Sequence, residues 1–347
     1  MTQQVSGQTF SERPRAAVME DVAARAGVSA MTVSRVLNTP EKVRPDTRAR
    51  VLDAVRELGY RPNFAARSLV TGRSGALGVV SFDTTLYGPA STLHGIEQAA
   101  RTHDYLVTIV NVTTLNRRSI AEAVNRLRFQ SVDGVVIVAP HESAADGLHH
   151  LPPDLPAVVV GARESLPVPV AAVDQAAGAV RATRHLLSLG HNTVWHLSGP
   201  EDWIDASARV EGWRSVLTAE GRQIPDPLRG DWSARSGFEA GRQLARDPEV
   251  TAIFAANDHM ATGVLRALRE VGRRVPEDVS VVGFDDVPEA PYLWPPLSTV
   301  RQNFTEVGRL AFRLLLERID GRTATPHRMI EPELVVREST GARPTSR

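Results

Sequence analysis

Residues Met19–Asn38 read MEDVAARAGVSAMTVSRVLN, and this stretch decides the fold of the first part of the chain. A first helix is predicted that ends at Gly27. Its apolar residues share one helical face, at Val22, Ala23 and Ala26. Ser29 offers a hydroxyl that can accept an amide of the next turn, so a second helix is predicted over Ala30–Leu37. Two short helices joined through a glycine turn are typical of a helix-turn-helix.

A third helix is predicted over about Pro45–Leu58. Proline suits the first helical position because its missing amide would have no partner there, and Asp46 suits the positive end of the helix dipole. Gly59 suits the stop. Three helices of this length bury only a small core, so we expect a marginal domain over 18–62, preceded by a disordered tail over 1–17.

The charge of the chain is unevenly distributed although its sum is zero. Arg13–Arg73 carries twelve Arg or Lys and six Asp or Glu, and the residues from Ser74 onward carry an excess of acids. A basic segment that contains a helix-turn-helix is typical of a surface that meets a polyanion such as DNA.

Length and composition restrict the remaining possibilities. The 347 residues suffice for two or three domains, and 42% hydrophobic residues with 23% charged residues are typical of a soluble globular chain. No apolar run approaches the ~18 residues of a membrane helix, and the polar start of the chain lacks the apolar core of a secretory signal. Cysteine is absent, which excludes disulfides and thiolate metal sites and fits a reducing compartment. We therefore expect a cytoplasmic protein without a membrane partner.

From Ala76 onward, short β-rich runs alternate with helical stretches in two series. The expected strands are Leu77–Phe82, Leu106–Val112, Gly134–Ala139, Ala157–Val160, Thr193–Leu197, Ala252–Ala255 and Val279–Phe284. The expected helices are Leu93–His103, Ser119–Phe129, Ala176–Ser188, Ala208–Ala219, Gly237–Ala245, Met260–Glu270 and Thr305–Ile319. This alternation predicts an α/β fold with doubly wound parallel sheets in two lobes. Such lobes bind ligands in the crevice at the carboxyl ends of their strands.

Words of sequence that occur in order within Met19–Leu69 closely resemble the amino-terminal part of the LacI family of bacterial transcriptional repressors. They are DVA at 21–23, AGVS at 26–29, TVSRVLN at 32–38, TR at 47–48, LGYRPN at 58–63 and AARSL at 65–69. A lone helix-turn-helix would be a weak signal, whereas this ordered run is specific.

The resemblance continues through the core, which is similar to the periplasmic-binding-protein-like core of the sugar-responsive, lac-repressor-like branch. The words that carry it are LSGP at 197–200, SAR at 207–209, GDWSA at 230–234, AND at 256–258, VVGFDD at 281–286, PLSTV at 296–300 and QNF at 302–304. The resemblance implies the following divisions: hinge helix and linker at 63–74, ligand-binding and dimerisation core at 75–341, lobe 1 at about 75–172 and 304–331, lobe 2 at about 173–303 and 332–341, and a polar tail at 342–347.

A recognition helix that enters the major groove by its amino-terminal end would read the DNA. The residues that it would present are Ser29, Ala30, Met31, Thr32, Ser34, Arg35 and Asn38. Arg35 can fork onto a guanine edge, whereas Ala30 and Met31 can only press on apolar edges such as a thymine methyl. Two alternatives stay open, core packing for Met31 and a surface ion pair for Arg35.

The stretch 63–70 has helical composition, but eight residues cannot hold a helix alone in water. The resemblance implies that it orders in the minor groove, with Leu69 as a wedge between base pairs. The other hinge residues assigned to DNA are Asn63, Ala66 and Arg67. Packing of Leu69 on the core is the alternative.

Position, chemistry and the resemblance indicate the ligand site. The candidates are Arg209, Trp232, Asn257, Asp285, Gln302 and Phe82, with Trp203 and Trp294 as weaker ones. Arg209 is expected at the head of a helix and outside the hydrophobic interior, where it can fork onto vicinal hydroxyls. Asp285 can accept two hydroxyls, and Trp232 can stack on a pyranose. The alternatives are helix capping for Asn257 and Asp258, an ion pair for Asp285 and core packing for Trp232.

The first lobe gives less guidance. The match is weak at His141 and Glu142, where relatives often carry an Asp, so the sugar read there stays open. We expect His141, His149 and His150 to be exposed loop residues and not metal ligands.

Together these features predict a sequence-specific repressor that a small sugar, a mono- or disaccharide or glycoside, releases from its operator, regulating carbohydrate-utilisation genes. A pseudo-palindromic double-stranded operator is bound by two helix-turn-helix domains, so we expect a homodimer. The polar tail at 342–347 lacks the leucine heptads of a tetramer helix. No phosphate loop, G-x-S-x-G or H-E-x-x-H motif is present, so we expect no enzyme, cofactor or metal. The alternatives are a sugar transport protein, a sugar hydrolase and a regulator that requires its ligand as corepressor.

Overall fold

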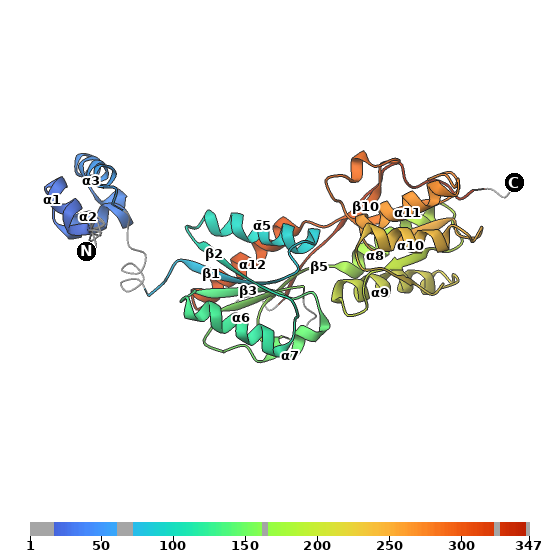
Figure 1. Cartoon of the computed structure of the whole chain (residues 1–347), viewed down its shortest axis with the longest axis horizontal. Helices are drawn as coiled ribbons and strands as arrows, with labels where there is room; N and C mark the ends of the chain where they lie inside the picture. The colour runs from blue at the N-terminus through green and yellow to red at the C-terminus, as the bar shows by residue number, and fades with distance from the viewer. Residues whose placement is uncertain (1–16, 61–71, 162–165, 323–326, 345–347) are drawn as a thin grey trace, which may run out of the picture. The chain divides into compact units, whose positions relative to one another are not determined.

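In the first part of the chain, three helices pack their apolar faces together around a small buried centre. The computed structural model describes residues 17–60, 72–161, 166–322 and 327–344. The first part, the head, ends at Ser74, and the second part, the core, begins at Gly75. Figure 1 shows both parts, with labels on their α-helices and on some of their strands.

The head contains three α-helices and one short 3-10 helix. They are α1 (Met19–Ala26), α2 (Ala30–Asn38), η1 (Pro40–Lys42) and α3 (Pro45–Glu57). Gly27 ends α1 with a left-handed φ of 64°, a conformation that glycine adopts without strain. The Ser29 hydroxyl caps α2 by accepting the amide of Thr32 at 3.2 Å. The helix-turn-helix is therefore formed by the residues that predicted it, and its buried centre includes Val22, Val33, Val36, Val51, Ala54 and Tyr60.

Lobe 1 of the core is a six-stranded parallel sheet with helices on both faces, in the strand order β11-β5-β4-β3-β1-β2 (Figure 1). Its strands are β1 (Ala76–Phe82), β2 (Leu106–Val112), β3 (Gly134–Val138), β4 (Ala157–Val160), β5 (Val170–Val173) and β11 (His327–Ile330). The helices on one face are α5 (Tyr87–Arg101) and α12 (Phe304–Ile319). Those on the other are α6 (Arg117–Phe129) and α7 (Ala145–His149), the latter preceded by η2 (Glu142–Ala144).

Lobe 2 repeats this arrangement with the strand order β12-β10-β9-β8-β6-β7, in which only β12 runs antiparallel. Its strands are β6 (Trp195–Ser198), β7 (Leu228–Arg229), β8 (Ala252–Ala255), β9 (Ser280–Asp285), β10 (Ser298–Arg301) and β12 (Glu333–Val335). The helices of its two faces are α8 (Gln175–Ser188) with α9 (Ile204–Ala219), and α10 (Ala234–Leu244) with α11 (Asp258–Glu270). A 3-10 helix, η3 (Ala290–Tyr292), precedes β10. The fold class predicted from the sequence is therefore confirmed.

The structure differs from the sequence predictions at element ends. Two helices start a turn or more before their predicted residues: α5 starts at Tyr87 and not Leu93, and α9 starts at Ile204 and not Ala208. The first turn of α5 contains Gly88 and Pro89, and that of α9 contains Asp205 and Ser207, so the apolar pattern is interrupted in both. Arg209 therefore lies in the second turn of α9 and not at its head, which corrects the prediction. Among the described residues, no helix combines the length and the apolar character that crossing a membrane requires.

Candidate functional site

The outward face of α2 carries residues that the sequence assigns to DNA. Val33 and Val36 are buried in the head, and Met31 and Arg35 lie one turn apart on the exposed side. Met31 is 66% exposed, so the alternative of core packing for it is wrong. The Arg35 Nη2 atom contacts the Met31 sulfur at 3.8 Å. The remaining assigned residues of this helix and its cap are exposed or half-buried: Ser29, Ala30, Thr32 and Ser34.

Ion pairs occupy other arginines of the head. Arg25 pairs with Glu57 at 2.6 Å between α1 and α3, and Arg56 pairs with Asp53 within α3. Among the described residues, no carboxylate lies within ion-pair distance of Arg35. Its guanidinium is therefore held only by the sulfur contact and is open to a base edge or a phosphate.

Much of the predicted DNA contact falls on residues that flank the three helices. Between residues 17 and 60 the basic residues exceed the acidic ones by only one, seven against six, so most of the excess positive charge of Arg13–Arg73 belongs to the flanks. The assigned residues that lie outside the described part are Asn63, Ala66, Arg67 and Leu69, together with the side chain of Asn38.

The core contains a cleft of about 770 Å³, counted with its open mouth, whose walls come from both lobes. Because parallel strands end at one edge of a sheet, the residues that close β8 and β9 meet there: Asn257 follows β8 and Asp285 ends β9. Arg209 and Trp232 line the same space. Lobe 1 contributes mainly apolar groups, among them Leu86, Tyr87, Val138, Val160, Phe304 and Val307.

A chain of hydrogen bonds connects Arg209 with Asp285 through two glutamines. Arg209 Nε donates to Gln175 Oε1 at 3.0 Å, Gln175 Nε2 donates to Gln302 Oε1 at 2.7 Å, and Gln302 Nε2 donates to Asp285 Oδ1 at 2.6 Å. Arg209 also donates to the carbonyl of Ala256, and its guanidinium lies 4.0 Å from the centroid of the Phe284 ring. The base and the acid are thus fixed without forming a direct ion pair, and each keeps polar atoms that a ligand can use.

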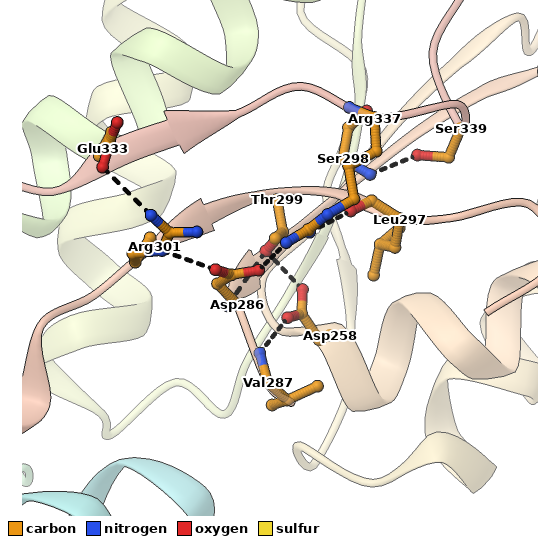
Figure 2. Close-up of polar contacts among 10 residues, drawn as sticks. All are labelled: Asp258, Asp286, Val287, Leu297, Ser298, Thr299, Arg301, Glu333, Arg337 and Ser339. Atoms are coloured by element: carbon orange, nitrogen blue, oxygen red, sulfur yellow. Dashed lines mark hydrogen bonds and ion pairs between the residues drawn. The ribbon is translucent and has the colours of Figure 1, made fainter. Parts of the chain in front are cut away.

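The loop that carries Asp285 has an unusual backbone, because Asp285 and Asp286 both have positive φ, 118° and 54°. Figure 2 shows what holds it. The Asp286 carboxylate pairs with Arg337 at 2.6 Å and with Arg301 at 2.7 Å. The next amide, of Val287, donates to Asp258 at 2.9 Å. Ion pairs on one side and a buried carboxylate on the other therefore position Asp285.

Asp258 is the buried carboxylate of that arrangement, and it is not the cap of its helix. Thr299 donates its hydroxyl to Asp258 Oδ1 at 2.6 Å. The cap of α11 is Asn257, whose Oδ1 accepts the amide of Met260 at 2.8 Å and whose Nδ2 donates to the Trp232 carbonyl at 3.0 Å. The capping alternative is thus found for Asn257 and is wrong for Asp258. Asn257 still lines the cleft, with one amide hydrogen left over.

Burial dominates the electrostatics of the cleft. It raises the pKa of the Asp285 carboxyl to about 7, although the Arg209 charge and the Gln302 hydrogen bond act in the opposite direction. Burial, aided by the nearby Asp285, raises the pKa of the Asp258 carboxyl to about 8. Burial also lowers the pKa of Arg209. Two acids with pKa values near neutrality beside a single arginine suit a ligand that brings hydroxyl donors and no negative charge.

Aromatic side chains and a contact between the His141 and Asp202 side chains join the lobes beside the cleft. Phe82 and His141 of lobe 1 have ring centroids 4.5 Å apart, and His141 lies 4.7 Å from the Trp203 ring of lobe 2. His141 Nδ1 lies 2.9 Å from Asp202 Oδ2. The ring of Trp203 is 5.4 Å from that of Trp232, whose buried indole N–H has no partner among the described residues. His141 is therefore buried, which corrects the expectation that it is an exposed loop residue.

The structure separates the assigned ligand residues into two groups. Arg209, Trp232, Asn257 and Asp285 line the cleft, as does the weaker candidate Trp203, whereas Gln302 and Phe82 stand behind its wall. The other weaker candidate, Trp294, is 84% exposed and lies in a second groove with Arg269 and Pro295, so its assignment to the wall is wrong.

Sequence reasoning missed most other residues of the wall, among them Gln175, Asp205, His259 and Tyr87, whose side chains carry polar groups. Asp205 precedes Arg209 by one helical turn, so a correct start for α9 would have indicated it. Gln175 lies two residues after Val173, where β5 ends, just as Asn257 lies two residues after Ala255, where β8 ends. The reasoning that indicated Asn257 would therefore also have indicated Gln175.

Comparison with known proteins agrees with this architecture. Residues 18–63 match the family of bacterial regulatory proteins, lacI family, and residues 183–340 match the periplasmic binding protein-like domain. The HTH-type transcriptional regulator CelR of Thermobifida fusca is 37% identical over 94% of this chain and 99% of its own length. The lactose operon repressor of Escherichia coli (strain K12) is 34% identical over 92% of this chain and 89% of its own.

Solved structures of relatives have the same fold. A lac repressor dimer bound to operator and the anti-inducer ONPF has a TM-score of 0.86 at 33% identity, covering 94% of this chain and 100% of that chain. A complex of transcriptional regulator CelR with cellobiose has a TM-score of 0.69 at 34% identity, covering 93% and 99%. The present chain thus belongs to the LacI family of bacterial regulatory proteins.

Proposed function

We propose that this protein is a sequence-specific DNA-binding transcriptional repressor that a small sugar releases from its operator, and that it regulates carbohydrate-utilisation genes. The sugar, a mono- or disaccharide or a glycoside, binds between the lobes of the core. The observation that carries this proposal is the joint placement of Arg209, Asp285 and Trp232 in the cleft. A donor fork, an acceptor and a flat apolar ring are the groups that the hydroxyls and the face of a pyranose require.

The head acts on DNA through α2, with Arg35 on a base edge and Met31 on an apolar edge. One head buries too little surface for tight binding, so two copies of the chain bind a pseudo-palindromic operator as a homodimer. The relative that was crystallised as a dimer on its operator supports this assembly. The relative that was crystallised with cellobiose makes this disaccharide the first sugar to test.

A selection from a randomised duplex library, followed by fluorescence anisotropy, tests the DNA part. We expect a pseudo-palindromic site and an affinity that falls steeply with salt as arginines release counterions. A flat salt response, or equal affinity for a scrambled duplex, contradicts it.

Calorimetry of sugar binding, with and without saturating operator, tests the coupling. A panel of glucose, galactose, cellobiose, lactose and maltose is first screened by thermal shift, in which a sugar at 100 times its dissociation constant stabilises the protein by ~2.7 kcal/mol. Release requires that the operator weakens sugar binding by the same factor by which sugar weakens operator binding. If the sugar binds equally well with and without operator, the inducer mechanism is excluded. If the operator strengthens sugar binding, the sugar is a corepressor.

A further inference from the structure

Asp205 is an acid of the cleft that forms no hydrogen bond or ion pair with the described residues. It lies in the first turn of α9, partly buried, and its side chain lines the space between the lobes. Among the described residues, no group donates a hydrogen bond to its carboxylate. Burial raises the pKa of this carboxyl, although the charge of Arg209 acts against the rise. A partly buried carboxylate without a hydrogen-bond donor keeps its acceptor capacity for a ligand, and its place in the first turn of α9 gives it only the weak support of the helix dipole.

Asp205 and Arg209 have the spacing of a helical ion pair but do not form one. Acids and arginines four residues apart do pair on exposed helices elsewhere in the core. Examples are Glu97–Arg101, Arg118–Glu122 and Arg266–Glu270, with N–O distances of 3.7, 2.8 and 2.7 Å. Arg209 instead donates to Gln175 and to the carbonyl of Ala256. The chain thus keeps an acid and a base one turn apart in the cleft, each with unused hydrogen-bonding capacity.

The contact between the lobes fixes the place of this acid. The amide of Ile204 donates to the carbonyl of Pro140 at 2.9 Å, and the amide of Glu142 donates to the carbonyl of Asp202 at 3.1 Å. These bonds anchor the start of α9 to lobe 1, so Asp205 lies where the two lobes meet. A ligand group that pairs with it there touches both sides of the junction.

We propose that Asp205 and Arg209 together bind one vicinal diol of the sugar. Arg209 donates to the oxygen of one hydroxyl, and Asp205 accepts the proton of the neighbouring hydroxyl. The inference rests on the proposed sugar-binding function and adds a specificity-determining residue to it. A sugar that lacks the second hydroxyl leaves the acid unsatisfied, and a uronic acid with a carboxylate at that place is repelled by it.

The test is calorimetry of the full-length protein with the strongest binder among glucose, galactose, cellobiose, lactose and maltose, and with each monodeoxy derivative of that sugar. The variants are Asp205→Ala, Asp205→Asn and, as a matched control on the exposed side of the same helix, Glu211→Ala. We expect Asp205→Ala to weaken binding of the parent sugar roughly 10- to 100-fold, as for a hydrogen bond to a charged group, with a smaller loss for Asp205→Asn and none for Glu211→Ala.

The monodeoxy series identifies the hydroxyl. We expect wild type to bind one derivative more weakly than the parent sugar, by a factor similar to the loss caused by Asp205→Ala. The Asp205→Ala variant should bind that derivative and the parent sugar with affinities within about twofold of each other. The melting temperature of sugar-free Asp205→Ala changes little, because an acid in the first turn contributes only weakly to helix stability. The proposal is overturned if the loss is the same for all derivatives in both proteins, or if the melting temperature falls steeply for both Asp205 variants. If wild type binds none of the five sugars, the sugar-binding function fails and this inference fails with it.

Discussion

The two functional surfaces hold their arginines in opposite ways. Arg35 on α2 is exposed and contacts only the sulfur of Met31 among the described residues. Arg209 in the cleft is 3% exposed, donates to Gln175 and to a backbone carbonyl, and lies against the Phe284 ring. A polyanion supplies its own strong attraction, so the head can leave its charge solvated until DNA arrives. A neutral sugar supplies none, so the cleft has to hold its donors in place beforehand.

This difference predicts how function and stability are linked in each part. In the head, a DNA-reading side chain can be removed without disturbing the fold. In the cleft, the proposed ligand residues Arg209, Asn257 and Asp285 also hydrogen-bond to their neighbours, so we expect a substitution there to change sugar affinity and stability together. Asp205 is the exception.

Arg209→Met has the largest expected effect. Truncating a buried, charged hydrogen-bonding group costs about 2–5 kcal/mol in binding, which is roughly 30- to 3,000-fold in sugar affinity. Methionine fills the space but leaves Gln175 Oε1 and the Ala256 carbonyl without their donor, so the melting temperature falls as well. Operator binding persists, which makes a permanently repressing variant. Calorimetry, anisotropy and a thermal melt measure the three quantities.

Two outcomes would break the contrast at this position. Unchanged sugar affinity would place the site elsewhere and make Asn257 and Asp285 doubtful too. Lost operator binding in a folded variant would assign Arg209 to the coupling between core and head.

Asp286→Ala follows, with a destabilisation of about 3 kcal/mol, the cost of breaking a largely buried ion pair. The side chains of Asp286 and Arg337 are 9% and 15% exposed, so the arginine loses its partner in a poorly hydrated place. Sugar affinity also falls, because the loop that presents Asp285 loses its anchor. Denaturant unfolding is the measurement. The control is Asp53→Ala, which breaks an exposed ion pair with Arg56 and costs at most about 1 kcal/mol. Equal losses of unfolding free energy for the two variants would show that the Asp286 ion pair contributes no more than a surface pair.

Arg35→Ala tests the head. Loss of a bidentate contact to a base edge costs about 1–3 kcal/mol, roughly 5- to 150-fold in affinity for the operator. The melting temperature stays constant because the side chain supports nothing in the described part of the head. Arg56→Ala is the matched control, since that arginine is already paired with Asp53. Similar losses for both variants would mean that Arg35 contributes general charge and no base reading.

The sequence predicts the fold well where a single strand or helix carries the signal. The strands β2, β4 and β8 begin and end at their predicted residues; β4 and β8 are buried throughout and read as continuous apolar runs. The strands β7, β11 and β12 have only two to four residues, partly or fully exposed, and gain their structure from neighbouring strands. No local pattern indicates them.

The site is predictable only in part for the same reason. Asn257 and Asp285 end strands of a parallel sheet, so their positions follow from local order. Gln175 and Gln302 are 127 residues apart, and their hydrogen bond exists only because lobe 2 folds the start of α8 against the end of β10. The burial of Arg209 depends on the same packing within lobe 2, and that of His141 depends on the contact between the lobes. Sequence reasoning therefore placed Arg209, Trp232, Asn257 and Asp285 together but did not indicate the hydrogen bonds that fix them.

The smallest expected effect is a pH dependence of stability in the core, caused by Asp285 and Asp258. Burial raises the pKa of these carboxyls to about 7 and about 8, whereas in the unfolded chain both lose their protons near pH 4. Above pH 4 the folded state thus binds more protons than the unfolded state. The stability that the two protons contribute is fully present below pH 4 and is lost as the pH rises through 7 and 8.

Buried histidines restrict the pH range in which this effect can be measured. Burial lowers the pKa of His185, His191 and His196, so their uptake of protons on unfolding reduces stability as the pH falls below about 6.5. Between pH 7 and 8.5 they are largely neutral in both states, and the carboxyls dominate. We expect the free energy of unfolding of the sugar-free protein to fall there by on the order of 1 kcal/mol per pH unit.

Denaturant unfolding at pH 7.0, 7.75 and 8.5 measures this slope, with Asp258→Asn as the variant that removes one of the two acids. The variant is less stable than wild type at pH 7, because asparagine cannot accept from both Thr299 and the Val287 amide, but its slope is shallower. The head contains no histidine, so we expect operator affinity without sugar to change little over the same range. If the free energy of unfolding falls with pH at the same rate in wild type and variant, Asp258 is ionised in the folded core. If operator affinity changes steeply with pH, the head shares the pH dependence that we assign to the core.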